Sequence, residues 1–301
     1  MIRVGPSGWS YPDWEGTVYT GLPRGGAHRL ALIARVFDFV EINASFYRTP
    51  PPQHATSWVE TVFDHPHFQF AAKLHQNFTH TRVYTAADVD AFHRFLDPLR
   101  ASGRLAALLL QFPWSFRATA ENWDYLRRIA GEFPTYPLVV EVRHSEWWKP
   151  RFFDLLREAG LSIANIDQPP LKDQVPPDEQ LTGPLAYIRF HGRNAAHWWS
   201  GQEPYYGARY DYLYEPTELE PWVDRINRLS QTAQSTLVAM NNHHRGDAVV
   251  NGLELMHALG RRDIRIPPGL LAEHPHRLGP IGRPLGGMEP DLFETEPHQD
   301  G

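Results

Sequence analysis

Eight short segments of the chain share one pattern, in which apolar residues at the start give way to polar or charged residues at the end. In residues 37–43 the alternation places Val40 and Ile42 on one face and Glu41 and Asn43 on the other, as in a buried strand whose second face turns polar. Segments long enough for helices fill most of the gaps. Eight strands alternating with helices predict an α/β fold, a (β/α)8 barrel of the TIM type with its site at the C-terminal ends of the strands. The expected strands are residues 2–9, 37–43, 68–74, 105–112, 138–143, 162–167, 185–191 and 236–242.

Two stretches depart from this alternation. Residues 168–184 contain five prolines and no apolar period long enough for a helix, so the sixth unit is expected to be irregular, with its helix missing or vestigial. Residues 263–301 are rich in proline and glycine and end in an acidic segment, which predicts a C-terminal extension or a disordered tail. We therefore predict one barrel domain over residues 1–262. The tail is expected to be removable at little cost because it offers few apolar groups to bury.

Composition narrows the class of protein further. A chain of 301 residues with 42% hydrophobic content suits one barrel, which takes about 250 residues, better than two smaller domains. The net charge of −6 gives no bulk attraction for nucleic acid or for an anionic membrane, so neither partner is favoured. Without cysteine the chain has no disulfide and no thiolate nucleophile. The sequence shows neither a signal peptide nor an apolar run of membrane-spanning length, which favours a cytoplasmic protein and leaves its oligomeric state open.

Strand parity predicts which side chains line the barrel, because the wholly apolar register of each strand should face the helices. Strand eight is ambiguous by this test. The inward side chains include three carboxylates, a lysine and two arginines, whose burial requires mutual pairing or a ligand. The predicted inward set is Arg3, Gly5, Ser7 and Trp9; Glu41 and Asn43; Lys73 and His75; Gln111; Glu141 and Arg143; Asn165 and Asp167; and Tyr187, Arg189 and His191.

Two interpretations of the inward charges are open: a self-satisfied layer of ion pairs, or a ligand site. We favour the site, because the charges gather at the C-terminal strand ends while the starts of strands four to eight stay aliphatic. Single residues are less informative. His191 fits a hydrogen-bonded core histidine as well as a catalytic one, and Lys73 can simply neutralise Glu41.

Known catalytic motifs are otherwise absent from the sequence. It contains no phosphate loop, no paired-histidine zincin motif and no Gly-x-Ser-x-Gly elbow. The pairs His243/His244 and His75/His80 fit no standard metal spacing, so we predict no metal site. No dinucleotide fingerprint appears, and we expect no cofactor.

Motifs at the strand ends, which span about residues 5–260, taken together resemble one known family. They are Ser7-Gly-Trp-Ser-Tyr11 with Trp14 and Gly16, Val40-Glu-Ile-Asn43 with Ser45-Phe-Tyr-Arg48 and Pro50, Lys73 with His80, Leu108-Leu-Leu-Gln-Phe-Pro113 with Phe116, Val140-Glu-Val-Arg-His144, Arg189-Phe-His-Gly192, and Asn241-Asn242 with Ala248 and Asn251. On these residues the chain resembles the YecE-like family, the proteins that carry domain of unknown function 72. The resemblance implies a TIM-type barrel, in agreement with the strand count, and carries no settled reaction.

Two functions from different classes fit these observations. The first is an enzyme, of the isomerase, lyase or hydrolase type, that performs general acid–base chemistry on a small polar anion such as a sugar phosphate, a sugar acid or a nucleoside-like compound. The second is a barrel that binds a metabolite, or docks a partner or single-stranded nucleic acid, without turnover. The fold favours the enzyme, by analogy. The predicted catalytic residues are Glu41, Lys73, Glu141, Asp167 and His191, and the predicted ligand-binding residues are Ser7, Trp9, Tyr11, Asn43, Tyr47, Gln111, Arg143, Arg189, Asn241 and Asn242.

Overall fold

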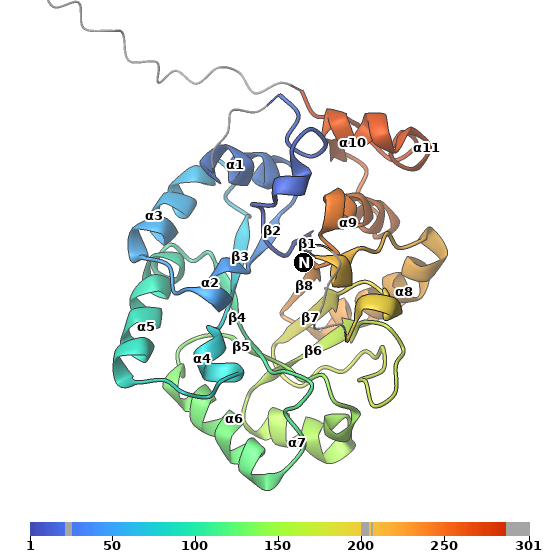
Figure 1. Ribbon diagram of the computed structural model, residues 1–301. Coiled ribbons are helices and arrows are strands. Elements are labelled where there is room, and N and C mark those ends of the chain that lie inside the picture. Colours follow the sequence, from blue (N-terminus) through green and yellow to red (C-terminus); the bar gives the residue numbers. More distant parts are fainter. Residues whose placement is uncertain (22–25, 200–204, 206, 287–301) are drawn as a thin grey trace, which may run out of the picture.

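Eight parallel strands form a nearly closed barrel in the computed structural model, which describes residues 1–21, 26–199, 205 and 207–286 (Figure 1). Each strand pairs with its neighbours in the order β1-β8-β7-β6-β5-β4-β3-β2. The predicted TIM-type barrel is thereby confirmed. The strands are β1 (Ile2–Pro6), β2 (Phe39–Ile42), β3 (Gln69–Lys73), β4 (Leu105–Gln111), β5 (Leu138–Glu141), β6 (Ser162–Asp167), β7 (Leu185–Phe190) and β8 (Ser235–Met240).

The barrel closes between β1 and β2 through a single bridge, from Ser7 to Glu41. The Gly8 N–H donates to the Glu41 carbonyl at 2.8 Å, which ties the two strand ends together. Lower down, the strands approach so closely that a Cβ atom on Gly5 would lie 1.8 Å from the carbonyl oxygen of Phe39. Only glycine fits at that position, since any side chain would push β1 away from β2.

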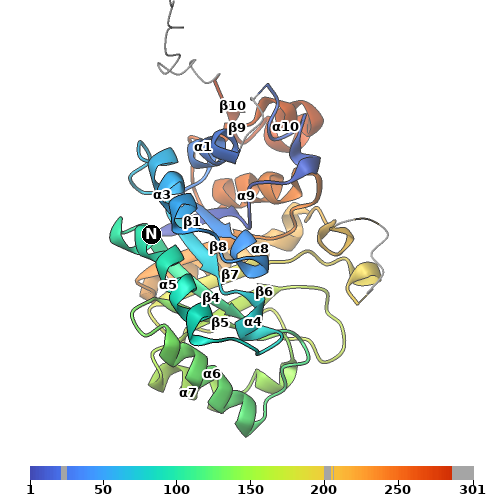
Figure 2. The same ribbon diagram turned by 60° about the vertical axis from the view of Figure 1, so that its left-hand side comes forward.

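Helices surround the strands, as the two views show (Figures 1 and 2). Their ends follow from the sequence: Thr85 and Asp88 form a capping box at the start of α5, and Pro150 occupies the first turn of α7. Between β6 and β7 no helix forms in residues 168–184, which confirms the irregular sixth unit. The outer helices are α1 (Gly26–Val36), α3 (Pro52–Thr61), α5 (Ala86–Ala101), α6 (Ala120–Glu132), α7 (Pro150–Glu158), α8 (Pro216–Thr232) and α9 (Asp247–Ala258), with short α2 (Ala44–Tyr47) and α4 (Gln76–Thr79) at strand ends.

The segment after residue 262 packs on the barrel, contrary to expectation. It forms β9 (Arg265–Ile266), α10 (Pro268–Glu273), α11 (Pro275–Leu278) and β10 (Arg283–Pro284). The prediction that this segment has little to bury is wrong for residues 264–285, because most of the apolar side chains there pack into the hydrophobic core. Residues 287–301 lie outside the described part of the chain. The side chains that have no exposed surface are Ile264, Ile266, Leu270 and Leu278.

Removing one methylene from this segment is a direct test of its packing. Ile264→Val is expected to lower the free energy of unfolding by about 0.5–1.5 kcal/mol, because it leaves a small cavity in a filled site. Ile281, which is half-buried, provides a matched control, and Ile281→Val should cost less. Urea unfolding of both variants measures the difference. Equal effects would show that Ile264 does not pack in solution as it does here.

Candidate functional site

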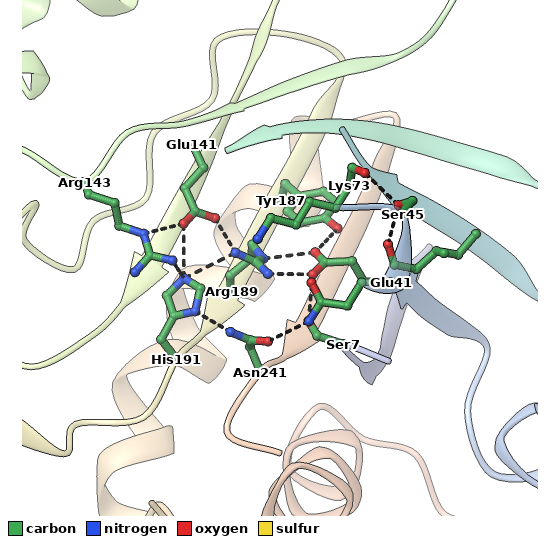
Figure 3. Close-up of polar contacts among 12 residues, drawn as sticks. Ser7, Glu41, Ser45, Lys73, Glu141, Arg143, Tyr187, Arg189, His191 and Asn241 are labelled. Atoms are coloured by element: carbon green, nitrogen blue, oxygen red, sulfur yellow. Dashed lines mark hydrogen bonds and ion pairs between the residues drawn. The ribbon is translucent and has the colours of Figure 1, made fainter. Parts of the chain in front are cut away.

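A layer of buried charges crosses the barrel at the C-terminal ends of the strands (Figure 3). Arg189 on β7 is at its centre and joins two carboxylates. Its Nε and Nη2 donate to Glu41 at 2.9 and 2.5 Å, and its Nη1 donates to Glu141 at 2.6 Å. Arg189 is 1% exposed, and both glutamates are fully buried. The parity prediction is confirmed for β2, β5 and β7, since all three side chains point into the barrel.

Glu41 uses both of its carboxylate oxygens within this layer. The Ser7 hydroxyl donates to Oε1 at 2.9 Å, and the Tyr187 hydroxyl donates to Oε2 at 2.8 Å, in addition to the bonds from Arg189. Burial, together with the Glu41 charge, raises the pKa of Tyr187 well above its usual value, so its hydroxyl keeps its proton and remains a donor. Glu41 therefore has no oxygen left for a substrate without breaking a buried bond.

Glu141 is saturated in the same way. Arg143 Nε donates to its Oε1 at 2.6 Å, and His191 Nε2 lies 3.3 Å from the same oxygen. Burial by itself raises the pKa of Glu141, but Arg189, Arg143 and His191 together hold it well below its usual value. His191 has a pKa lowered well below its usual value by burial and by Arg143, so it is neutral. The Asn241 amide donates to Nδ1 of His191 at 2.9 Å, which leaves the ring proton on Nε2, toward Glu141.

Lys73 is the exception in this layer, because its amine makes no ion pair or hydrogen bond within the described residues. Its Nζ lies 3.8 Å from the centre of the Phe46 ring. The sequence-based alternative, that Lys73 neutralises Glu41, is not what the contacts show, since Arg189 takes that place. Burial and Arg189 lower the pKa of Lys73 to about 7, against the opposing effects of Glu41 and Glu141.

The lowered pKa of Lys73 makes the stability of the protein depend on pH. Between pH of about 7 and 10.5 the folded chain holds a neutral amine and the unfolded chain an ammonium. Since the unfolded state binds more protons there, stability rises with pH across that window. Lys73→Met is expected to raise the free energy of unfolding at neutral pH and to flatten this rise, as measured by urea unfolding at several pH values. Lys149→Met, at an exposed lysine, should leave the slope unchanged; an unchanged slope in both variants would contradict the lowered pKa.

A cavity of about 570 Å³ lies at the mouth of the barrel, next to the charge layer. An adjoining hollow of about 450 Å³ shares Tyr47, Lys73, Arg143, Arg209 and Tyr210 with it and adds Gln111 and His80 to the lining. Aromatic rings form much of the wall; Trp9 packs edge-on against Trp58 at 5.1 Å. The cavity is lined by Gly8, Trp9, Ser10, Tyr11, Asn43, Ala44, Tyr47, Trp58, Lys73, Arg143, Arg189, Gly207, Arg209, Tyr210, Asn241 and His243.

The predicted site residues fall into four groups. Those that line the main cavity are Trp9, Tyr11, Asn43, Tyr47, Lys73, Arg143, Arg189 and Asn241. Gln111 lines the adjoining hollow. Those that form the buried support beneath are Ser7, Glu41, Glu141 and His191, while Asp167 and Asn242 lie elsewhere.

Asp167 faces the helices and not the barrel interior, so its predicted convergence with the other charges is wrong. It accepts bonds from Arg193 at 2.8 and 2.7 Å, from the Tyr214 hydroxyl at 2.7 Å and from the Trp222 indole at 2.7 Å. In the sheet it is in register with Phe190, one residue away from the inward Arg189. The parity rule failed on β6 because three groups on and before α8 donate hydrogen bonds to the carboxylate, and these bonds stabilise it on the outer face of the strand. The donors are Arg193, Tyr214 and Trp222. Its neighbour Asn165 also points outward, and binds the backbone of Gln180.

Asn242 also lies outside the cavity. Its amide donates to the Tyr212 carbonyl and to Asn251 Oδ1, both at 2.9 Å. These bonds hold the segment before α8 against α9. Strand eight, whose parity was ambiguous, instead turns Asn241 inward, since Ala239 is in register with Arg189.

Four cavity residues with aromatic or basic side chains are not among the predicted site residues: Trp58, Arg209, Tyr210 and His243. Trp58 lies on α3, and Arg209 and Tyr210 follow the insertion after β7, so strand parity carries no signal for them. His243 had been considered only as half of a histidine pair; its ring stacks on Tyr11 at 4.2 Å. Among the described residues, no three His, Cys, Asp or Glu side chains gather as metal ligands would. Within the same part of the chain, every helix is too short or too polar to cross a bilayer.

Comparisons with known proteins agree with this architecture. A family profile described as "Protein of unknown function DUF72" matches residues 3–275. UPF0759 protein YunF of Bacillus subtilis (strain 168) is 31% identical over 278 residues, which cover 86% of this chain and 95% of that protein. UPF0759 protein YecE of Escherichia coli (strain K12) is 32% identical over 222 residues, 64% of this chain and 74% of that one.

Solved structures show the same fold. The crystal structure of a DUF72 family protein from Thermotoga maritima MSB8 matches with a TM-score of 0.77 and 32% identity, over 87% of this chain and 100% of that one. A DUF72 family protein from Enterococcus faecalis V583 matches with a TM-score of 0.76 and 29% identity, over 87% and 96% of the two chains.

Proposed function

We propose that this chain, which belongs to the DUF72 family, is an enzyme that performs general acid–base chemistry on a small anionic metabolite of the sugar or nucleoside kind, bound in the cavity at the barrel mouth. The observation that carries the proposal is Lys73. Its amine lines the cavity, makes no ion pair or hydrogen bond within the described residues, and has a pKa of about 7. A group that is half-protonated near neutral pH can both take and return a proton in one reaction.

Lys73 is a better proton carrier than the predicted Glu41 and Glu141. Each oxygen of the two glutamates already faces a donor within the layer, and neither side chain has exposed surface. In this proposal the carboxylates act as fixed charges that hold Arg189 in place, and burial together with Arg189 lowers the pKa of Lys73. His191 positions Glu141 from behind, since the proton on its Nε2 points toward that carboxylate.

The charge of the cavity wall supports an anionic ligand. Lys73, Arg143, Arg189 and Arg209 line it, and the described lining of both hollows includes no aspartate or glutamate. The Arg143 side chain is 11% exposed and its guanidinium lies 5.6 Å from the Trp198 ring, so it presents a held cation to the cavity. Arginine suits carboxylate and phosphate because its planar fork can donate two bonds to one anion.

A second candidate function is binding without turnover, and the aromatic wall favours it. Trp9, Trp58, Tyr47 and Tyr210 line the cavity with aromatic rings, the kind of surface on which a sugar or a base can stack. Single-stranded nucleic acid is the less favoured ligand of this kind, because the chain carries a net charge of −6.

A metabolite panel tests both functions. Thermal unfolding detects binding, since a ligand at about 100 times its dissociation constant adds about 2.7 kcal/mol of stability. Proton NMR of the same mixtures in D2O detects turnover or exchange of substrate protons. We expect anionic sugars or nucleotides among the ligands, and expect Lys73→Met to retain binding while losing about 10²–10⁴ in turnover.

The outcomes separate the alternatives. Arg143→Met should weaken the binding of every anionic ligand, whereas Arg151→Met, at an exposed arginine away from the cavity, should not. Ligands that are all uncharged or cationic would contradict the anion site. Binding of several metabolites with no turnover of any of them would favour the non-catalytic barrel.

A further inference from the structure

We propose that Lys73 is a nucleophile that forms an imine with an anionic aldehyde or ketone, so that the substrates of this site are small carbonyl compounds bearing a phosphate or carboxylate group. This inference deepens the function proposed above and rests on it. It assigns the site a chemical class of substrate and a covalent step.

The position of the amine favours attack on a carbonyl carbon. Nζ lies 3.8 Å from the centre of the Phe46 ring, which holds it in place without using its lone pair. Both nearby carboxylates are bound to Arg189, as the close-up shows (Figure 3). An amine without a bonded acceptor in the described residues, facing a cavity, is placed to react with whatever the cavity holds.

The charges around Lys73 keep the amine partly neutral. Glu41 on β2 and Glu141 on β5 favour the ammonium, whereas Arg189 on β7 and Arg143 after β5 oppose it. Burial is the largest contribution, and the pKa falls to about 7. His80, at the end of α4, has a pKa lowered to about 4 by burial and by Lys73, so it adds no positive charge at neutral pH. Desolvation and neighbouring cations are the means by which lysines become nucleophiles in imine-forming sites.

The cations of the cavity wall would bind the anionic group at the other end of the substrate, away from its carbonyl carbon. Arg143 lines both hollows together with Lys73. Asn43 and Asn241, whose amides lie 3.5 Å apart, occupy the same cavity and can donate to hydroxyl or carbonyl oxygens. A carbonyl carbon at Lys73 and an anion at Arg143 define a short, bifunctional compound.

The step balances without a further reagent. The Nζ lone pair adds to the carbonyl carbon, the C–N bond forms, and the carbonyl π electrons move to oxygen. The C–O bond then breaks as the nitrogen forms a double bond to carbon, and both protons of the neutral amine leave with the oxygen as water, which gives the imine. Protonation of its nitrogen acidifies the adjacent C–H bond, and this links the covalent step to acid–base chemistry on the substrate.

Reductive trapping on the unmodified protein tests the proposal. The chain has three lysines, Lys73, Lys149 and Lys172, and the last two are exposed, so they are internal controls. The full chain is incubated at neutral pH with dihydroxyacetone phosphate or pyruvate and sodium cyanoborohydride, and the labelled lysine is located by peptide mass mapping. Uncharged dihydroxyacetone is the matched control compound. We expect at least about tenfold more labelling of Lys73 than of the other two, because its neutral fraction at pH 7 is on the order of a thousandfold larger than that of a lysine with the ordinary pKa.

Each result decides the proposal. Selective labelling of Lys73 by dihydroxyacetone phosphate would show that the anionic group of the substrate is a phosphate. Selective labelling by pyruvate would show that it is a carboxylate. Labelling that is equal across the three lysines, or as efficient with dihydroxyacetone as with the anions, would overturn it. If Lys73→Met abolishes turnover in the metabolite panel while no adduct forms, the acid–base function stands and the imine falls. An adduct without turnover would support the imine and contradict the proposed function.

Discussion

Replacing Arg189 with methionine is expected to lower the free energy of unfolding by about 3–5 kcal/mol, which makes it one of the most damaging single changes in the chain. Arg189 donates three bonds to Glu41 and Glu141, and all three side chains are at most 1% exposed. Methionine fills a similar volume but leaves two buried carboxylates facing each other without a cation. Urea unfolding at pH 7 measures the loss.

Two comparisons separate the electrostatic cause from packing. Arg228→Met breaks an exposed pair with Glu179 and should cost less than about 1 kcal/mol. Adding Glu41→Gln and Glu141→Gln to Arg189→Met should restore much of the stability, because neutral groups of similar shape replace the unpaired charges. No recovery in the triple variant would show that shape, and not charge, makes Arg189 necessary.

The pH dependence of the same variant provides an independent check. Without Arg189, which is the largest effect opposing burial at Glu141, burial should raise the pKa of this carboxylate above its unfolded value. The folded variant would then bind more protons than the unfolded chain, so its stability should fall as the pH rises through that range and partly recover in acid. The wild-type protein, in which Glu141 is held ionised, should not gain stability in acid.

Replacing Asp167 with alanine is expected to cost about 3–5 kcal/mol as well, yet to leave ligand binding in the remaining folded protein unchanged. The Asp167 carboxylate is 1% exposed and satisfies Arg193, Tyr214 and Trp222, whose donors would lose their partner. Burial and the Asp167 charge raise the pKa of Tyr214 well above its usual value, so it stays a donor. This outcome would show that Asp167 stabilises the packing between β6 and α8 and takes no part in ligand binding.

The matched change is at an exposed aspartate. Asp154→Ala breaks a surface pair with Arg157 and should change stability by less than about 1 kcal/mol. Asp167→Asn, expected to cost about 1.5–3 kcal/mol, keeps the shape and provides folded protein for binding assays if the alanine variant does not fold. A loss of ligand binding in Asp167→Asn, with its fold intact, would return Asp167 to the site.

The arrangement of Lys73 and Arg189 explains how the two sequence-based interpretations are related. The inward charges form a self-satisfied ion-pair layer, and the same layer also sets the electrostatics of the cavity beside it. The saturated carboxylates keep Arg189 fixed, and burial together with Arg189 lowers the pKa of Lys73, whose amine makes no ion pair or hydrogen bond within the described residues. Stability and reactivity should therefore respond together when the layer is changed.

The sequence by itself determined the barrel, because strand alternation is a local property. A buried strand must be apolar on the face that packs on helices. The alternation of Val40 and Ile42 with Glu41 shows this face in the sequence, before the helices that pack on it are known. The same reasoning placed Glu41, Glu141, Arg189 and Lys73 at one end of the barrel. It also identified residues 168–184 as a unit without a helix, since proline excludes one.

Tertiary structure decided which charges meet. Glu41 and Arg189 are 148 residues apart in the chain, and nothing local indicates that they pair while Lys73 stays unpaired within the described residues. Asp167 shows the limit of the parity rule: an outward carboxylate with buried donors on a helix has the same sequence pattern as an inward one. The segment after residue 262 shows a similar limit for the prediction of packing. Its apolar residues stabilise it because they all reach one surface of the barrel, and only the folded chain provides that surface.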